Sequence, residues 1–168
     1  FFNRAGICLL NGYGLTETSP VICVRLPHRN VLTTAGRLLD HTEWEVRDEA
    51  GTTVLPRGEK GVLWVKGPQV MEGYFANESA TDAVLRDDWF CTGDLAALTD
   101  HDDVVICGRV KDTIVLRGGE NVEPEAIEAV LVESPLIADA ILVGHTKKHL
   151  GALLVPEGDA VRSRRPCL

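Results

Sequence analysis

Short apolar runs separated by glycine-containing turns constrain the fold of this chain more than any other feature. They occur at residues 7–10, 21–24, 44–47, 61–67, 104–107, 113–116, 138–143 and 150–155. Many of these runs contain β-branched or aromatic residues, which favour strands, and Gly, Asn or Asp stands at several of their ends. The sequence therefore predicts a structure rich in strands, with few helices.

Two segments have the pattern of helices. The first begins near Asn77 or Ser79, both good N-cap residues, and apolar residues follow at helical spacing. The second covers residues 123–133, where Pro124 suits a first helical turn and an apolar face follows. The turn between the last two predicted strands carries Lys147 and Lys148, which we expect to be a solvated charge pair.

Composition narrows the class of protein. The 168 residues include 25 acidic and 17 basic side chains, a net charge of −8, which argues against a broad nucleic-acid surface. No apolar run approaches the roughly 20 residues of a membrane-spanning helix. The five cysteines are odd in number and far apart, which favours reduced thiols and a cytoplasmic location over a disulfide framework or a zinc site.

The segment at residues 11–20, NGYGLTETSP, is the first place where chemistry could occur. Gly12 and Gly14 would let a ligand approach the backbone, and Tyr13 offers an aromatic face. The hydroxyl of Thr16 suits phosphate oxygens, and Glu17 could hold a hard cation such as Mg²⁺. A polar turn between two strands explains the same residues, and neither a Rossmann nor a Walker loop fits.

Two further segments carry the same ambiguity. Asp94 follows Thr-Gly at the expected mouth of a turn, where it could accept hydrogen bonds from a ribose diol or from its own backbone. In residues 108–124, Gly118 and Gly119 stand before a helix, as a mobile loop would require. A solvated hairpin is the alternative, and for Arg117 it is the favoured interpretation.

Read together, these segments resemble the acyl-adenylate-forming (AMP-binding) ligase family, especially bacterial long-chain fatty acyl-CoA synthetases. The resemblance covers nearly the whole chain, from Phe1 to about Gly158, and suggests a C-terminal fragment. It is carried, in order, by GYGLTETSP, GEKGVLWVKGPQVMEGYF, WFCTGDLA and GRVKDTIVLRGGENVEPEAIE.

The resemblance implies a fold of the α/β and α+β classes. Residues 1–110 would be the C-terminal part of the large AMP-binding domain, with its β-barrel portion. Residues 111–168 would be an incomplete, small α+β domain that moves about a hinge. The tail at 159–168 departs from the family, as a truncated or frameshifted reading frame would.

The resemblance also implies roles for the first segment. Tyr13 would stack on adenine with Gly12 and Gly14 close by. Thr16 would bond the α-phosphate, and Glu17 would ligate Mg²⁺. Residues 71–74, Met-Glu-Gly-Tyr, match a further signature, for which core packing is the favoured interpretation.

The remaining implied roles fall later in the chain. Asp94 would accept the ribose hydroxyls, and Arg109 would help to clamp the ribose. Lys111 would lie at the hinge between the two half-reactions. Gly118 and Gly119 would line the channel for the pantetheine arm of CoA.

The implied activity is ATP-dependent conversion of a long-chain fatty acid to acyl-AMP, followed by transfer to CoA, with ATP, Mg²⁺ and CoA required. Peripheral membrane contact would belong to the full enzyme. The family's phosphate loop and its catalytic lysine in a Gly-Lys context are not found in these residues, so we expect the chain alone not to complete adenylation. An amino-acid or aryl-acid adenylating module and a non-catalytic remnant remain alternatives.

Overall fold

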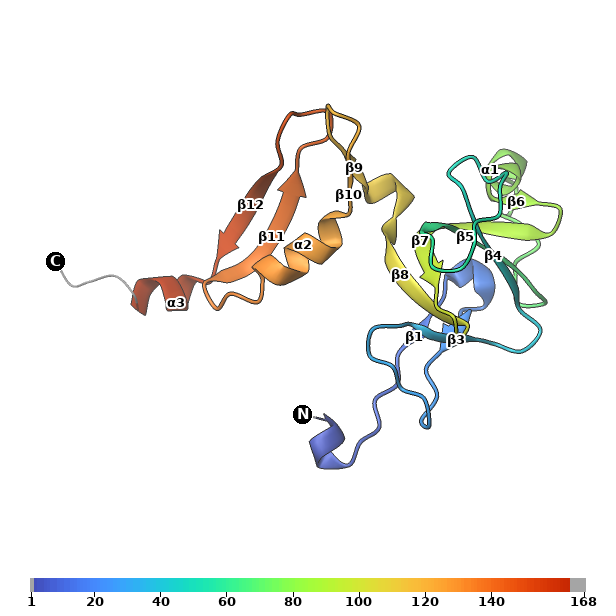
Figure 1. The fold of residues 1–168 in the computed structure, drawn as a ribbon, viewed down its shortest axis with the longest axis horizontal. Helices are drawn as coiled ribbons and strands as arrows, with labels where there is room; N and C mark the ends of the chain where they lie inside the picture. Colours follow the sequence, from blue (N-terminus) through green and yellow to red (C-terminus); the bar gives the residue numbers. More distant parts are fainter. Residues whose placement is uncertain (1, 164–168) are drawn as a thin grey trace. The chain divides into compact units, whose positions relative to one another are not determined.

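The computed structural model describes residues 2–163 (Figure 1). Contacts divide the chain into two compact units, Phe1–Cys107 and Gly108–Leu168, and each is described by itself. The expected domain boundary after residue 110 is close to this division, and the assignment of domains stays a prediction. Cys167 and the last part of the atypical tail, 164–168, lie outside the described residues.

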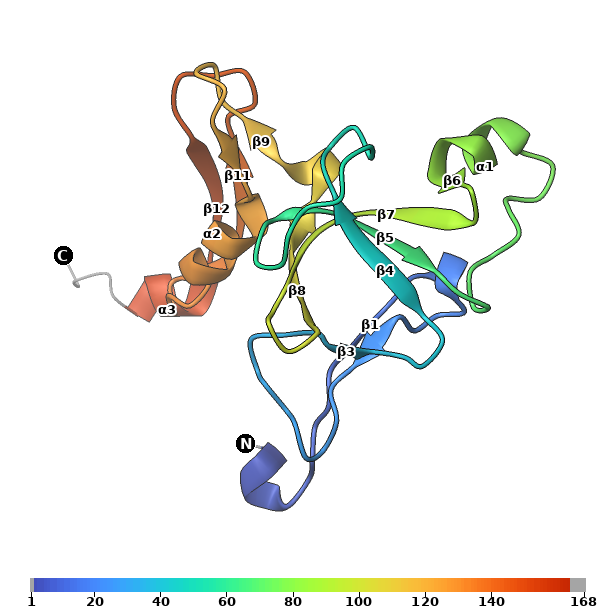
Figure 2. The ribbon, with the colours of Figure 1, turned by 45° about the vertical axis from the view of Figure 1, so that its right-hand side comes forward.

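The first unit is built on one antiparallel sheet. Its strands follow the order β1-β2-β3-β8-β7-β5-β4, with β6 paired to β7, and Figure 2 shows β4, β5 and β7 side by side. The bounds are Gly12–Tyr13 (β1), Cys23–Val24 (β2), Gly36–Leu38 (β3), Glu43–Arg47 (β4), Gly61–Lys66 (β5), Leu85–Arg86 (β6), Trp89–Leu98 (β7) and Asp103–Arg109 (β8). The runs predicted at 44–47, 61–67 and 104–107 are confirmed as strands.

The central strand β5 is buried on both faces. Leu63 and Val65 point into the main core, whereas Val62 and Trp64 belong to a smaller cluster with Leu95. All four of these β5 side chains are at most 4% exposed. Each buried apolar side chain of this size contributes roughly 1.5–3 kcal/mol, so β5 is the main anchor of the first unit.

Helices in the first unit are short. They are two 3₁₀ turns, η1 (Phe2–Ala5) and η2 (Thr16–Thr18), and one α-helix, α1 (Glu78–Val84). Of the two N-caps expected for α1, the structure selects Asn77, whose side chain accepts a hydrogen bond from the Ala80 N–H at 3.1 Å.

The strand predicted at residues 7–10 is wrong. These residues pair with no strand, and Ile7 and Leu9 are 53% and 58% exposed. An apolar run alone does not make a strand, because a strand also needs a partner to take its backbone hydrogen bonds.

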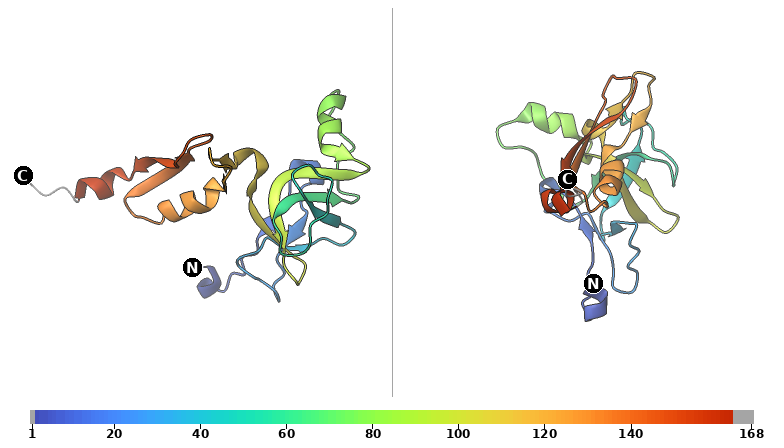
Figure 3. Two further views of the ribbon diagram at one scale, coloured as in Figure 1. Left: turned by 45° about the horizontal axis from the view of Figure 1, so that its top comes forward. Right: turned by 90° about the vertical axis from the view of Figure 1, so that its left-hand side faces the viewer.

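In its described part, the second unit contains two hairpins, two α-helices and one 3₁₀ turn. Its elements are η3 (Val110–Asp112), β9 (Ile114–Val115), β10 (Asn121–Val122), α2 (Pro124–Leu131), β11 (Ile137–Val143), β12 (Gly151–Pro156) and α3 (Gly158–Ser163). Helix α2 lies against β11, and Figure 3 shows the two together with β12 beyond them. The predicted helix at 123–133 is confirmed, although it ends two residues earlier, at Leu131.

The α2–β11 contact includes a polar link. The Glu128 carboxylate accepts a hydrogen bond from the backbone N–H of Leu142 at 2.6 Å. The Ala140 N–H is taken by the Asp139 side chain at 2.8 Å. Side chains therefore satisfy two backbone donors of β11.

Within residues 2–163, no helix combines the length and apolar character needed to cross a membrane. In the described part of the chain, no disulfide joins the four cysteines, Cys8, Cys23, Cys91 and Cys107.

Candidate functional site

Tyr13 and Asp94, 81 residues apart in the sequence, meet in the first unit. The Tyr13 hydroxyl donates a hydrogen bond to Asp94 Oδ2 at 2.6 Å. Asp94 is only 3% exposed. Burial, together with the hydrogen bond to Asp94, raises the pKa of Tyr13 far above its ordinary value, so the phenol remains a donor at neutral pH. The structure thus unites two of the segments that the sequence analysis singled out.

A bulge in β7 presents Asp94. The register of β7 against β5 shifts at this point, and Gly93 adopts a φ of 71°, which glycine accepts without strain. Thr92 fixes the bulge, since its hydroxyl donates to the Leu63 carbonyl at 2.8 Å and accepts from the Asp94 N–H at 3.1 Å. The expectation that Asp94 lies at the mouth of a turn is wrong, because the strand continues through the bulge to Leu98.

The two glycines beside Tyr13 have different surroundings. A Cβ on Gly14 would collide with the backbone of Pro20, so the fold itself requires glycine there. A Cβ on Gly12 would lie 3.5 Å from the Cys23 carbonyl, an ordinary contact. The fold therefore explains the glycine at position 14 but not the one at position 12. At Gly12, the close approach of a ligand to the backbone remains as a reason for glycine.

A hollow of about 330 Å³ lies against Gly12 and Tyr13. Its size is at the lower end of the range found for ligand pockets. It is lined by Asn11, Gly12, Tyr13, Arg25, Leu32, Thr33, Thr34, Ala35 and Ile106. The backbone beside Tyr13 is thus open to a small ligand.

Glu17 is held by the segment that the sequence analysis assigned to core packing. The Tyr74 hydroxyl donates to Glu17 Oε1 at 2.8 Å, and the Met71 N–H donates to the Glu17 carbonyl at 2.8 Å. Met71 does pack against the main core, as expected, but Tyr74 is 37% exposed, and its contact with Glu17 was not predicted. The sequence contained only a tyrosine in a polar stretch, which does not identify a partner 57 residues away.

The hydrogen bond between Tyr74 and Glu17 changes the pKa of the Tyr74 phenol. The hydrogen bond to the carboxylate raises the pKa of Tyr74, with a smaller contribution from burial. Tyr74 is therefore a protonated donor to Glu17 at neutral pH.

The donor set around Glu17 fits one kind of metal binding. Among the described residues, no three or more His, Cys, Asp or Glu side chains are grouped to hold a metal ion. Mg²⁺ commonly keeps several water ligands and is bound through one or two carboxylates together with substrate phosphates. A single carboxylate such as Glu17 fits Mg²⁺ that arrives with a nucleotide, not Mg²⁺ alone. Thr16, the neighbouring candidate, is exposed at the start of η2.

The remaining candidates lie in the second unit. Arg109 is the last residue of β8, which crosses the division between the units, and Lys111 is an exposed residue of η3. Gly118 and Gly119 form the tip of the β9–β10 hairpin, where Gly119 has a φ of 88° and its N–H donates to the Leu116 carbonyl at 2.9 Å. This part of the chain is a hairpin with an exposed Arg117, as the alternative interpretation predicted. The roles expected for Arg109, Lys111 and the two glycines stay predictions.

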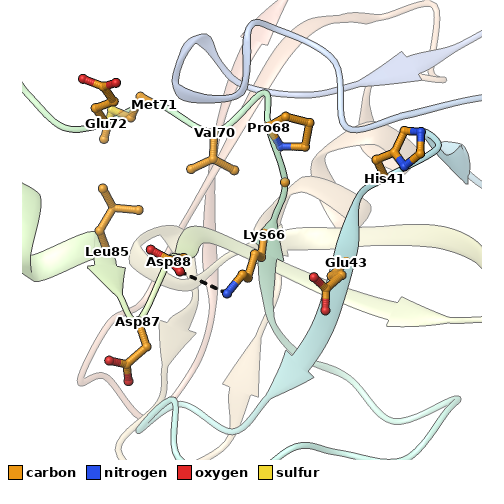
Figure 4. Close-up of a pocket in the computed structure, with 11 residues that line it drawn as sticks. His41, Glu43, Lys66, Pro68, Val70, Met71, Glu72, Leu85, Asp87 and Asp88 are labelled. Carbon is orange, nitrogen blue, oxygen red and sulfur yellow. Dashed lines mark hydrogen bonds and ion pairs between the residues drawn. The ribbon is translucent and has the colours of Figure 1, made fainter.

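A larger cavity of about 530 Å³ lies elsewhere in the first unit and is strongly acidic (Figure 4). Lys66, its one lysine, pairs with Asp88 at 3.1 Å. The lining residues are His41, Glu43, Lys66, Gly67, Pro68, Val70, Met71, Glu72, Leu85, Asp87 and Asp88. Four carboxylates would repel the phosphates of a nucleotide, so this cavity is not the candidate nucleotide site.

Comparison with known proteins identifies a family. The family model described as AMP-binding enzyme matches residues 1–75, and that described as AMP-binding enzyme C-terminal domain matches residues 111–165. The chain belongs to the AMP-binding enzyme family.

Curated relatives include long-chain fatty acid ligases. The chain is 42% identical to the chloroplastic long-chain-fatty-acid–[acyl-carrier-protein] ligase AEE15 of Arabidopsis thaliana, over 99% of this chain and 24% of that protein. It is 35% identical to the long-chain-fatty-acid–CoA ligase FadD15 of Mycobacterium bovis, over 95% and 25%. The chain thus spans about a quarter of the length of these relatives.

Solved structures show the same fold. The O-succinylbenzoate coenzyme A synthetase MenE of Bacillus subtilis, in complex with ATP and magnesium ion, matches 95% of this chain with 35% of its own. The TM-score is 0.83 and the identity is 32%. This likeness confirms the α/β and α+β fold class expected from the sequence.

Proposed function

We propose that this chain forms the adenosine-binding part of a ligase that activates a carboxylic acid as its acyl-adenylate. The observation that carries the proposal is the hydrogen bond between Tyr13 and the buried Asp94, because it joins an aromatic residue that lines the hollow at Gly12 to a fixed carboxylate. An aromatic face suits a nucleobase, and a carboxylate suits a ribose diol. Membership of the AMP-binding family supports the same assignment.

In this proposal, the residues of the chain bind and orient the nucleotide. Tyr13 stacks on adenine beside Gly12 and Gly14, and Asp94 accepts the ribose hydroxyls with help from Arg109. Thr16 donates to the α-phosphate. Glu17 holds Mg²⁺, which offsets negative charge on the phosphates when it is bound.

The chemistry explains why positioning is needed. A carboxylate is a poor electrophile, so its oxygen attacks the α-phosphorus of ATP to give acyl-AMP and pyrophosphate. A thiol then attacks the acyl carbon and displaces AMP as the thioester forms. In the proposal, Lys111 is the hinge between these steps, and Gly118 and Gly119 line the channel for the thiol's pantetheine arm.

For the substrates, we propose a long-chain fatty acid and CoA. The relatives FadD15 and AEE15 support the fatty acid. Likeness to an indoleacetate–CoA ligase of Aromatoleum aromaticum, 36% identical over 91% of this chain and 30% of that protein, favours an aryl acid instead. The name of AEE15 also supports an acyl-carrier protein as an alternative acceptor. Thioester formation with free CoA or with carrier protein, in the complete enzyme, separates the two acceptors.

Isothermal titration of the 168-residue chain with ATP and AMP tests the nucleotide site. We expect binding that Asp94→Asn weakens by roughly 10- to 100-fold, the effect of losing a hydrogen bond to a charged group. Asp103→Asn is the matched control, since Asp103 is also buried, at 5% exposure, but pairs with Arg29. Absence of heat with the unaltered chain, or equal binding by Asp94→Asn, contradicts the proposal.

ATP–pyrophosphate exchange with fatty acids tests the extent of the activity. We expect the isolated chain to show no robust exchange, because the phosphate loop and the Gly-Lys lysine of the family are not among its residues. Robust exchange would show that these 168 residues suffice for adenylation.

A further inference from the structure

We propose that Tyr74 is a positioning residue for Glu17: its hydroxyl fixes the carboxylate so that the second oxygen is available to a Mg²⁺ ion brought by ATP. The inference rests on the proposed nucleotide-binding function. It starts from the 2.8 Å hydrogen bond between the Tyr74 hydroxyl and Glu17 Oε1. Within the described part of the chain, Glu17 Oε2 has no hydrogen-bond or ion-pair partner.

Tyr74 can act in this way because its own backbone is anchored. The Tyr74 N–H donates to the Thr81 hydroxyl at 2.9 Å, and that hydroxyl donates to the Asn77 carbonyl at 3.0 Å. Asn77 is the N-cap of α1, and Thr81 lies within the helix. The position of the phenol is thus tied to a helix, whereas a free side chain on a loop would move.

Glu17 is restrained at two points by the same segment. Its carbonyl accepts from the Met71 N–H at 2.8 Å, and Met71 packs against the main core. The Tyr74 hydroxyl then removes the remaining rotational freedom of the carboxylate. A carboxylate that is already oriented loses less conformational entropy when a ligand binds, so its affinity for that ligand is higher.

The geometry predicts that Tyr74 affects ATP binding only in the presence of Mg²⁺. Tyr74 touches Glu17 and is not one of the residues that line the hollow beside Tyr13. Removal of the hydroxyl should therefore weaken binding only where Mg²⁺ takes part. A purely structural role for Tyr74 would weaken binding with and without the metal alike.

The test compares ATP binding by isothermal titration in excess Mg²⁺ and in EDTA. For Tyr74→Phe we expect affinity for ATP in Mg²⁺ to fall about three- to tenfold, as the loss of one partly exposed hydrogen bond predicts, with affinity in EDTA unchanged. The control is Thr52→Val, which removes another exposed hydroxyl next to a carboxylate, at 3.2 Å from Asp48 Oδ2. Thr81→Val, which keeps the phenol but loosens its anchor, should give a smaller loss in Mg²⁺ only.

The outcomes distinguish this inference from the function on which it rests. Equal affinities of Tyr74→Phe and the unaltered chain in Mg²⁺, or equal losses in Mg²⁺ and EDTA, overturn the role of Tyr74 alone. If the unaltered chain does not bind ATP under either condition, the proposed function fails, and the role of Tyr74 fails with it.

Discussion

Gly12 and Gly14 flank the same tyrosine but are glycines for different reasons. A side chain on Gly14 would collide with the Pro20 backbone, whereas one on Gly12 meets only an ordinary contact. We expect Gly14→Ala to lower the free energy of unfolding by more than about 2 kcal/mol, and Gly12→Ala by less than about 0.5 kcal/mol. Urea denaturation measures both changes.

The same pair tests the ligand site. Gly12→Ala should weaken ATP binding in titration calorimetry while the fold is preserved, because its methyl group stands where the ligand approaches the backbone. Full affinity in Gly12→Ala would mean that the nucleotide does not come close to this residue.

Cys23 makes the stability of the first unit sensitive to alkali. The thiol is fully buried, and burial raises its pKa from 9.0 to about 12. Because the unfolded chain releases this proton first, the contribution to stability is complete below pH 9 and is lost as the pH rises towards 12. The expected loss is about 1.4 kcal/mol per pH unit.

Chemical denaturation at pH 8, 9 and 10 measures this dependence. The raised pKa of Tyr13 adds a similar loss only above pH 10, so the interval between 9 and 10 reports mainly on cysteine. Cys23→Ala should be less stable at pH 8 because packing is lost, and its stability should fall less steeply above pH 9. An unchanged slope would show that the Cys23 thiol does not titrate in this way.

At the scale of single elements, the start of α1 gives a clear comparison. Both Asn77 and Ser79 have the chemistry of an N-cap, but only Asn77 accepts the hydrogen bond from Ala80. We expect Asn77→Ala to destabilise the unit by about 1 kcal/mol, and Ser79→Ala to change its stability by less than about 0.5 kcal/mol. Thermal and urea unfolding of the two variants check this, and equal effects would contradict the assigned cap.

Strands were predictable where the apolar pattern of the run itself indicates that the strand is buried. The run at 61–67 is apolar on both faces and became the central strand β5, as its composition indicated. The run at 7–10 has a similar apolar character but no partner strand, and pairing is a tertiary property that the run itself does not encode. The bulge at Gly93 was missed for the same reason, since it exists only as a register shift against β5.

The sequence showed which residue types the candidate site contains, but it did not show which of these residues contact one another. Glycine, tyrosine, glutamate and aspartate in these segments were compatible with nucleotide binding and with ordinary polar turns, and only the resemblance to a family assigned their roles. Neither indicated that the Tyr13 hydroxyl is bonded to Asp94, or that Tyr74 reaches Glu17. Such contacts depend on how the sheet brings distant segments together.

At the scale of the whole molecule, burial is unequally shared between the two units. Both apolar core clusters lie in the first unit. In the second unit the buried apolar side chains include Ile114, Ala140 and Leu142, and every residue of β12 is exposed. The second unit therefore has less apolar burial to oppose local opening.

Hydrogen–deuterium exchange measures this difference. We expect the backbone amides of β12 to exchange at least about 100-fold faster than those of β5, because local opening of an exposed strand costs less than unfolding of the core. The amides of β7 serve as an internal reference for the first unit. Protection of β12 equal to that of β5 would contradict the expected order.

The bond between Tyr13 and Asp94 also bears on the order in which the first unit folds. Closing a loop of 81 residues costs about 4 kcal/mol in chain entropy beyond a constant term, and the contact repays this cost only when β7 is in place. A chain that has formed β1 and β2 but not β7 lacks the Tyr13–Asp94 pair on which the proposed nucleotide site depends. In the proposed function, ATP binding is therefore a reporter of completed folding, and added nucleotide is expected to shift the folding equilibrium of the entire first unit, not of one loop.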